Sequence, residues 1–132
     1  VVVNDGLVSE DNAELLNTLL EELQKRGLLL IDATSGDNLE KIAGKGLARR
    51  KADIVIDKDF RKAHIDAELK RAEEIAFSKG QVVVVIDPKP VAVVEVYKWI
   101  KSFSPQVSYE EAKTLELTKP FALVPISNLV ME

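Results

Sequence analysis

The chain has no cysteine and a single histidine, His64. The absence of cysteine excludes disulfides, zinc sites built on thiolates and a cysteine nucleophile. One histidine excludes any site that needs two imidazole ligands from this chain, and we interpret His64 as a surface residue of a helix. Long apolar runs are also missing, since the longest has five residues, Val82 to Ile86, and a membrane-spanning helix needs about 20. The sequence therefore predicts no membrane span.

Positive charge is scarce as well. Lys and Arg total 18 against 22 Asp and Glu, which gives a net charge of -4 at pH 7. The short basic cluster Arg49-Arg50-Lys51 is too small to bind nucleic acid phosphates alone, and we expect it to be solvated. Nucleic acid is therefore not an expected partner. The remaining composition, with 46% hydrophobic and 30% charged residues over 132 positions, is typical of one globular domain.

Short continuous apolar runs recur along the chain. Such runs, without polar alternation, are typical of strands buried on both faces of a parallel sheet. We expect strands at residues 1–3, 28–31, 54–56, 82–86 and 121–126.

Helical patterns fill the intervals between these runs. The expected helices begin near Ser9, Asp37, Arg61 and Pro90, and glycines at positions 27 and 80 are expected to end the first and the third. Residues 106–119 are polar and fit either a short helix or an insertion. The alternation of strands and helices predicts an α/β fold of parallel β/α units with about five strands. An open sheet and part of a β/α barrel both fit residues 1–132, which we interpret as a single domain.

Aspartates recur at the ends of the expected strands. Four strands end in or beside Asp5, Asp32, Asp57 or Asp87, and the fifth ends at Ser127. In parallel β/α folds the functional site lies at the carboxyl ends of the strands, so these carboxylates would form an oxygen-rich site for Mg²⁺, Ca²⁺ or Mn²⁺. A carboxylate held near others also serves as a general base. The alternative is helix capping, for which aspartate is a favoured residue between a strand and a helix.

Other polar and aromatic residues carry weaker signals. Asp53 and Asp59 flank the third expected strand, and we interpret them as a strand-start polar group and a helix cap. Tyr97 and Trp99 lie two residues apart on an expected helix and therefore point in different directions. One of the two should be in the core, and the exposed one could stack on a sugar.

Five segments resemble, in the same order and at similar intervals, the motifs of one known family. Residues 3–9 are similar to a Val-Asn-Asn-His-Met-Gly-Ser strand end, and residues 20–35 to a helix followed by Phe-Leu-Asp-Ser-Arg-Thr. Residues 53–59 are similar to Asp-Val-Phe-Leu-Asp-Asn-Asp, residues 85–88 to Ile-Gly-His-Pro, and residues 123–129 to Leu-Val-Pro-Val-Ser-x-Leu. The family is that of the divergent polysaccharide deacetylases, and the chain resembles the C-terminal portion of its domain.

The resemblance implies a β/α barrel with a divalent metal, usually zinc, at the carboxyl ends of the strands. Water activated by this metal attacks the amide carbonyl of an N-acetyl sugar. The resemblance also implies an extracytoplasmic location, periplasmic or secreted, although this chain shows no signal-peptide pattern.

The chain departs from the family motifs at the positions of their metal-binding and other functional residues. Gly6 stands where the family has its first metal histidine, Asp87 replaces the histidine of Gly-His-Pro, and Thr34 replaces the arginine. The family's opening aspartate pair has no counterpart here. Zinc prefers nitrogen or sulfur ligands, so either a harder divalent metal binds through carboxylates or the chemistry is lost. About five strands do not close a barrel, so we expect an N-terminal segment, a second copy or a rearranged open sheet to cover the edges.

Three functions therefore remain open. The first is metal-dependent hydrolysis of N-acetyl groups on a glycan, the second is non-catalytic binding of glycan or protein, and the third is assembly through exposed edges. The departures favour loss of catalysis. The expected site residues are Asp32 and Asp87 for catalysis, Asp5, Asp57 and Asp87 for metal binding, and Ser127 and Trp99 for substrate contact.

Overall fold

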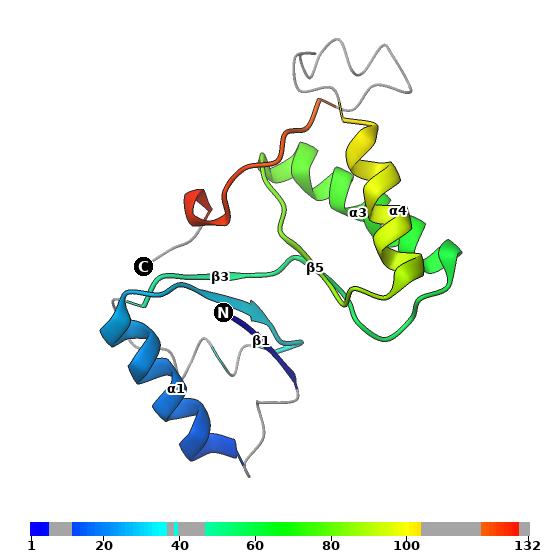
Figure 1. Ribbon diagram of the computed structural model, residues 1–132. Coiled ribbons are helices and arrows are strands. Elements are labelled where there is room, and N and C mark those ends of the chain that lie inside the picture. The colour runs from blue at the N-terminus through cyan, green and yellow to red at the C-terminus, as the bar shows by residue number, and fades with distance from the viewer. Residues whose placement is uncertain (6–11, 37–38, 40–46, 104–119, 130–132) are drawn as a thin grey trace.

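The computed structural model describes residues 1–5, 12–36, 39, 47–103 and 120–129, and every structural statement below concerns these residues. Figure 1 shows their arrangement. In chain order the elements are β1 (Val2–Asn4), α1 (Ala13–Arg26), β2 (Leu30–Ala33), β3 (Arg49–Lys51), β4 (Ile54–Ile56), α3 (Lys62–Lys79), β5 (Val84–Ile86), α4 (Pro90–Lys101) and the 3-10 turn η3 (Ile126–Asn128).

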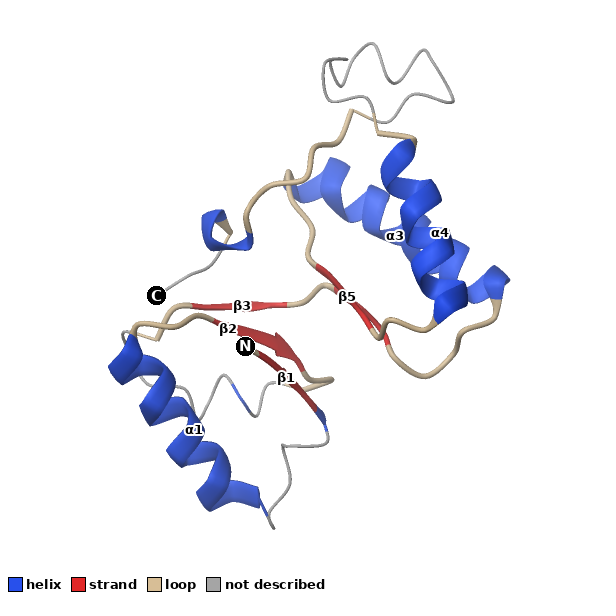
Figure 2. Cartoon of the chain, viewed as in Figure 1, coloured by secondary structure: helices blue, strands red, loops and turns tan. Residues whose placement is uncertain are grey.

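The strands form two small parallel sheets, as Figure 2 shows. The first has the order β1-β2-β3, with Val3 opposite Asp32 and Asp32 opposite Lys51. The second pairs β4 with β5, with Ile56 opposite Ile86. The α/β class and the parallel direction that the sequence predicted are confirmed. Both sheets are open, and the described residues form no closed barrel.

One extended segment, residues 49–56, joins the two sheets. Within it the chain changes partner, because the Ala52 N–H donates to the Asp32 carbonyl at 2.8 Å and the Asp53 N–H donates to the Val83 carbonyl at 2.9 Å. The Asp53 carboxylate fixes this change, since Oδ2 accepts from the Val83 N–H at 2.8 Å and lies 3.0 Å from Arg50 Nη2. The predicted role of Asp53 as a polar group at the start of a strand is confirmed.

Each sheet has its own hydrophobic core. Helix α1 turns an apolar stripe toward the first sheet because leucines recur at helical spacing along it. This core contains Leu16, Leu20 and Leu23 of α1 with Val3, Leu30, Leu39 and Leu47. Helices α3 and α4 lie side by side against the second sheet (Figure 1), where Ile65, Leu69, Ala72 and Ala92 pack with Ile54 and Ile56.

The helix ends follow the sequence signals closely. Gly27 and Gly80 end α1 and α3 in the left-handed region, with φ of 66° and 83°, where a side chain would be strained. Pro90 opens α4 as predicted. Helix α1 begins after Asn12, while the expected cap Ser9 lies outside the described residues, as does the ambiguous stretch 106–119. Of the helix expected to begin near Asp37, only Leu39 is described up to residue 46. None of the described helices has the length and apolarity needed to cross a membrane.

One strand was not predicted, and one predicted strand was wrong. Arg49–Lys51, expected to be a solvated basic cluster, forms β3, because its backbone pairs with β2 and its side chains find acidic or carbonyl partners. Residues 121–126, expected to be the fifth strand, have no strand pairing and lead into η3. Pro120 precedes this stretch and Pro125 lies within it, and both lack the N–H that a sheet ladder needs. Phe121 packs instead on the Phe77 ring, with centroids 5.0 Å apart.

Candidate functional site

Asp32 lies near the carboxyl end of β2 and is 3% exposed. Its Oδ1 accepts hydrogen bonds from the Thr34 N–H at 2.9 Å and from the Thr34 hydroxyl at 2.5 Å. An aspartate that bonds the backbone two residues later shapes the turn that follows a strand. Asp32 therefore fixes the turn at residues 34–36.

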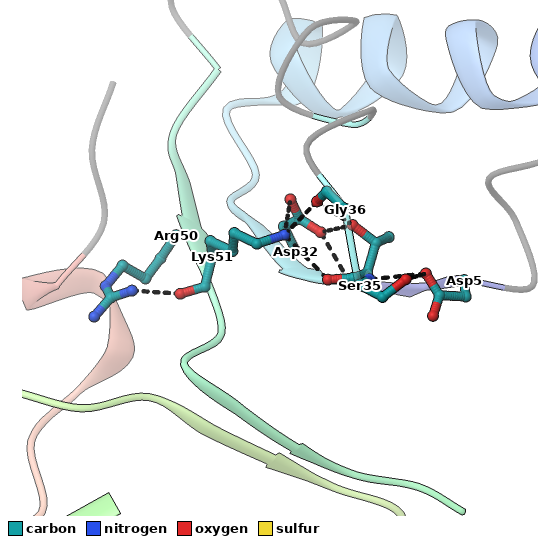
Figure 3. A network of polar contacts seen from close by, with 7 residues as sticks. Asp5, Asp32, Ser35, Gly36, Arg50 and Lys51 are labelled. Atoms are coloured by element: carbon teal, nitrogen blue, oxygen red, sulfur yellow. Dashed lines mark hydrogen bonds and ion pairs between the residues drawn. The ribbon is translucent and has the colours of Figure 1, made fainter. Parts of the chain in front are cut away.

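The positive partner of Asp32 is Lys51, which the register of β3 places directly opposite. Its Nζ lies 3.5 Å from Asp32 Oδ2 and donates to the carbonyl oxygens of Thr34 at 3.0 Å and of Gly36 at 2.5 Å. Figure 3 shows the Lys51 side chain extending toward Asp32 and Gly36. Burying a carboxylate costs several kcal/mol in order of magnitude unless an opposite charge compensates it. The ammonium of Lys51 supplies that charge.

Asp5, which follows β1, holds the same turn from its other side. Its Oδ1 accepts from the Ser35 N–H at 2.8 Å and from the Ser35 hydroxyl at 3.1 Å (Figure 3). The bond from the Ser35 backbone, with the Ser35 hydroxyl and the positive charges of Lys58 and Lys51, outweighs the effect of burial and lowers the pKa of Asp5 below its usual range. We call Asp5, Asp32, Thr34, Ser35 and Lys51 the Asp–Lys cluster.

The other two predicted aspartates follow the second sheet. Asp57 and Asp87 directly succeed the paired residues Ile56 and Ile86, and both are exposed. The Asp87 N–H donates to the Ile56 carbonyl at 2.9 Å, which extends the pairing of the two strands. Neither α3 nor α4 receives a side-chain cap at its N-cap position.

Asp59, predicted to be a cap, stands just before α3. It accepts from the Arg61 N–H at 3.1 Å and pairs with the Arg61 guanidinium, which holds the pKa of the carboxyl far below its usual range. His64 lies in the first turn of α3 and is partly exposed, as predicted. Its Nδ1 is 3.9 Å from Asp59 Oδ2.

The predicted metal ligands do not converge in the described part of the chain. Among those residues, no three His, Cys, Asp or Glu side chains are close enough to hold a metal ion. Asp5 and Asp32 meet at the turn of residues 34–36, but there Asp5 Oδ1 and Asp32 Oδ1 accept protein hydrogen bonds and Asp32 Oδ2 faces an ammonium. Zinc prefers nitrogen and sulfur donors, so this donor set does not fit the zinc ion that the family resemblance implies.

The two predicted substrate contacts lie elsewhere. Trp99 is half-buried, donates from Nε1 to Glu73 Oε1 at 2.9 Å, and meets the Phe103 ring edge to face at 4.9 Å. Tyr97 is 60% exposed, so the expected split between a packed and an exposed aromatic is confirmed, with Tyr97 as the exposed one. Ser127 is exposed in η3.

An apolar hollow of about 780 Å³ adjoins Trp99. It lies among α3, β5, α4 and residues 120–129, and its lining includes Phe77, Val84, Trp99, Phe103 and Phe121. The lining of this hollow is mostly apolar, with Glu73 and Gln81 among its polar side chains, and it contains no member of the Asp–Lys cluster.

Sequence reasoning found the acidic members of the cluster and missed Lys51. The sequence did contain a signal for it, because Lys51 ends the basic run Arg49-Arg50-Lys51 just before the apolar run 54–56. Recognising it required the pairing of β3 with β2, which no local pattern reveals.

Parallel β/α units with a polar cluster at the carboxyl ends of the strands place this domain in the α/β class whose sites lie at that edge. More specifically, the chain belongs to the divergent polysaccharide deacetylase family, whose model matches residues 4–130. No curated protein and no solved structure matches the chain.

Proposed function

We propose that this domain binds an N-acetylated glycan and does not deacetylate it with a metal held by its own aspartates. The observation that carries the proposal is the pairing of Asp32 with Lys51, in which a buried carboxylate faces an ammonium at 3.5 Å. Deacetylation in this family depends on metal-activated water. A carboxylate already neutralised by a lysine is a poor ligand for that metal.

Family membership supports a sugar as the ligand, and with it an extracytoplasmic location. The carboxyl edge of the sheets offers polar groups that suit sugar hydroxyls. Asp57 and Asp87 are exposed there, and Ser35 carries a hydroxyl on the neighbouring turn. Carboxylates accept strong hydrogen bonds from hydroxyl groups.

Metal-dependent deacetylation is the second candidate, and one observation favours it. The register of Ile56 with Ile86 puts Asp57 and Asp87 on neighbouring strand ends. Two adjacent carboxylates are suitable ligands for Mg²⁺ or Mn²⁺, which take oxygen donors and keep several waters. In this case Asp87 would hold the metal, and Asp32 would serve the fold only.

The test is a calorimetric titration of the whole chain with N-acetylglucosamine oligomers in EDTA, followed by an assay of acetate release with Zn²⁺, Mn²⁺ and Mg²⁺. We expect binding in EDTA and no acetate release with any metal. Asp87→Ala should weaken binding about tenfold, the effect of losing one charged hydrogen bond. Glu21→Ala, which removes an exposed carboxylate from α1, is the matched control and should bind like the wild type.

Metal-dependent acetate release that disappears in Asp87→Ala would replace this proposal with the deacetylase function. Absence of sugar binding in both EDTA and metal would reject glycan recognition altogether.

A further inference from the structure

A buried oxygen of the Asp–Lys cluster has no hydrogen-bond donor. Asp32 Oδ2 is inaccessible to solvent and accepts no hydrogen bond, and its nearest positive group is Lys51 Nζ at 3.5 Å. Buried carboxylate oxygens are nearly always hydrogen-bonded or bound to a cation. This atom is therefore placed to face a cation.

Two backbone carbonyls point at the same position. Lys51 Nζ donates to Thr34 O and Gly36 O in addition to facing Asp32 Oδ2, so three oxygens surround the ammonium, as Figure 3 shows. An ammonium has three N–H donors, which equals the number of oxygens. We propose that these three oxygens form a cation site that the tethered ammonium of Lys51 occupies, and that removal of the Lys51 side chain opens it to Ca²⁺.

The oxygens are held in place by contacts that do not involve Lys51. Asp32 Oδ1 binds the N–H and hydroxyl of Thr34, and Asp5 Oδ1 binds the N–H and hydroxyl of Ser35. The turn therefore keeps its shape when Lys51 is replaced. A site whose ligands are already ordered loses little entropy when a cation enters.

The donor chemistry selects the kind of cation. One carboxylate and two carbonyls are hard oxygen ligands with no nitrogen or sulfur, which disfavours zinc. Ca²⁺ accepts carbonyl oxygens in irregular geometry and fills the remaining positions with water, whereas Mg²⁺ requires a nearly ideal octahedron. The Lys51 side chain is 45% exposed, so its removal leaves a path from solvent for the ion and its waters.

The inference shares the Asp32–Lys51 pair with the proposed function, but its test measures cations and needs no sugar. Failure to bind Ca²⁺ would leave the glycan titration unaffected, and absence of glycan binding would leave the cation result unaffected.

The experiment is a calorimetric titration of Lys51→Ala with CaCl₂, alongside MgCl₂ and ZnCl₂. We expect saturable binding of one Ca²⁺ per chain, with binding to the wild type at least about tenfold weaker. At a Ca²⁺ concentration about 100 times Kd, the folding equilibrium of Lys51→Ala should shift about 100-fold toward the folded state. Lys58→Ala, which removes a nearby positive charge without touching the three oxygens, is the matched control and should gain no Ca²⁺ binding.

Combining Asp32→Asn with Lys51→Ala should abolish the gain. If Lys51→Ala is unfolded in EDTA, Ca²⁺ should refold it, and Lys51→Met, which keeps an apolar stem, provides a second variant. The proposal is overturned if Lys51→Ala stays folded without binding Ca²⁺, if Ca²⁺ fails to refold an unfolded variant, or if Lys58→Ala gains the same binding.

Discussion

At the scale of single residues, Asp32 has the largest structural role among the predicted site residues. Its carboxylate accepts two hydrogen bonds from Thr34 and faces Lys51. We expect Asp32→Ala to lower the free energy of unfolding by about 1–3 kcal/mol, because the buried Thr34 donors lose their acceptor. Asp32→Asn keeps an acceptor oxygen and should cost less.

Urea unfolding of the variants measures this difference. Asp57→Ala removes an exposed aspartate from an equivalent strand end and should stay within about 0.5 kcal/mol of the wild type. Equal losses in Asp32→Ala and Asp57→Ala would show that the turn at residues 34–36 does not depend on Asp32.

Asp59 gives a prediction about pH. Its pKa is lowered chiefly by the hydrogen bonds from the Arg61 side chain, so the folded chain binds this proton less tightly than the unfolded chain, where the value is 3.8. The stabilisation is therefore fully present above that value and is lost as the pH falls below it. Both side chains lie at the surface, where screening keeps the effect small. Urea unfolding of wild type and Asp59→Asn should differ most at neutral pH and converge in acid, whereas a pH-independent difference would contradict the assignment.

The sequence revealed the negatively charged residues of the candidate site more readily than their positively charged partner. Asp5, Asp32, Asp57 and Asp87 were found because each follows an apolar run, which is a local pattern. Lys51 was not found, because its contact with Asp32 depends on β3 lying beside β2. The two residues are 19 positions apart in the sequence, and Figure 3 shows them side by side. Local patterns thus predicted candidate ligands, and the sheet register decided which of them are neutralised.

At the scale of elements, the side chain of Asp53 determines how the two sheets are joined. Its Oδ2 accepts from the Val83 N–H beside β5 and pairs with Arg50 of β3, and both charged side chains are 16% exposed. Asp53→Ala should lower the free energy of unfolding by about 1–3 kcal/mol, since a partly buried donor and a guanidinium both lose their acceptor.

Hydrogen exchange gives the specific readout for Asp53. The Val83 amide should exchange faster in Asp53→Ala, while the amides of α1, which belongs to the other core, should change only as far as global stability falls. Asp53→Asn retains an acceptor and is the matched control. Unchanged protection of the Val83 amide in Asp53→Ala would contradict the role given to this carboxylate.

The helices were easier to predict than the strands. Gly27, Gly80 and Pro90 mark helix ends by their own backbone preferences, so α1, α3 and α4 followed from short stretches of sequence. Strands depend on partners instead. The apolar run 121–126 has suitable side chains for a strand, but Pro120 precedes it and Pro125 interrupts it. Its Phe121 ring packs on Phe77 and Phe103.

At the scale of the whole molecule, the two open sheets have separate cores and outer strands that, in the described part of the chain, pair on one side only. Among the described residues, β1 pairs only with β2 and β5 pairs only with β4. Unpaired edges are templates for pairing with another chain, and proteins usually cover or charge them. The outer strand β1 carries no charge, and the side chain of Val2 is 54% exposed.

We therefore expect two copies of this chain to associate through β1. Light scattering after size exclusion should show a mass that rises with protein concentration. Val2→Lys places a charge on the edge strand, where a lysine opposes edge-to-edge pairing, and should shift the population toward monomer. Val93→Lys is the matched control, because Val93 is 49% exposed on α4 and belongs to no strand, and should leave the mass unchanged. A wild-type chain that stays monomeric at every concentration would contradict association through β1. If both lysines shifted the population toward monomer equally, added charge in general would be the cause. Pairing through β1 predicts an effect of Val2→Lys alone.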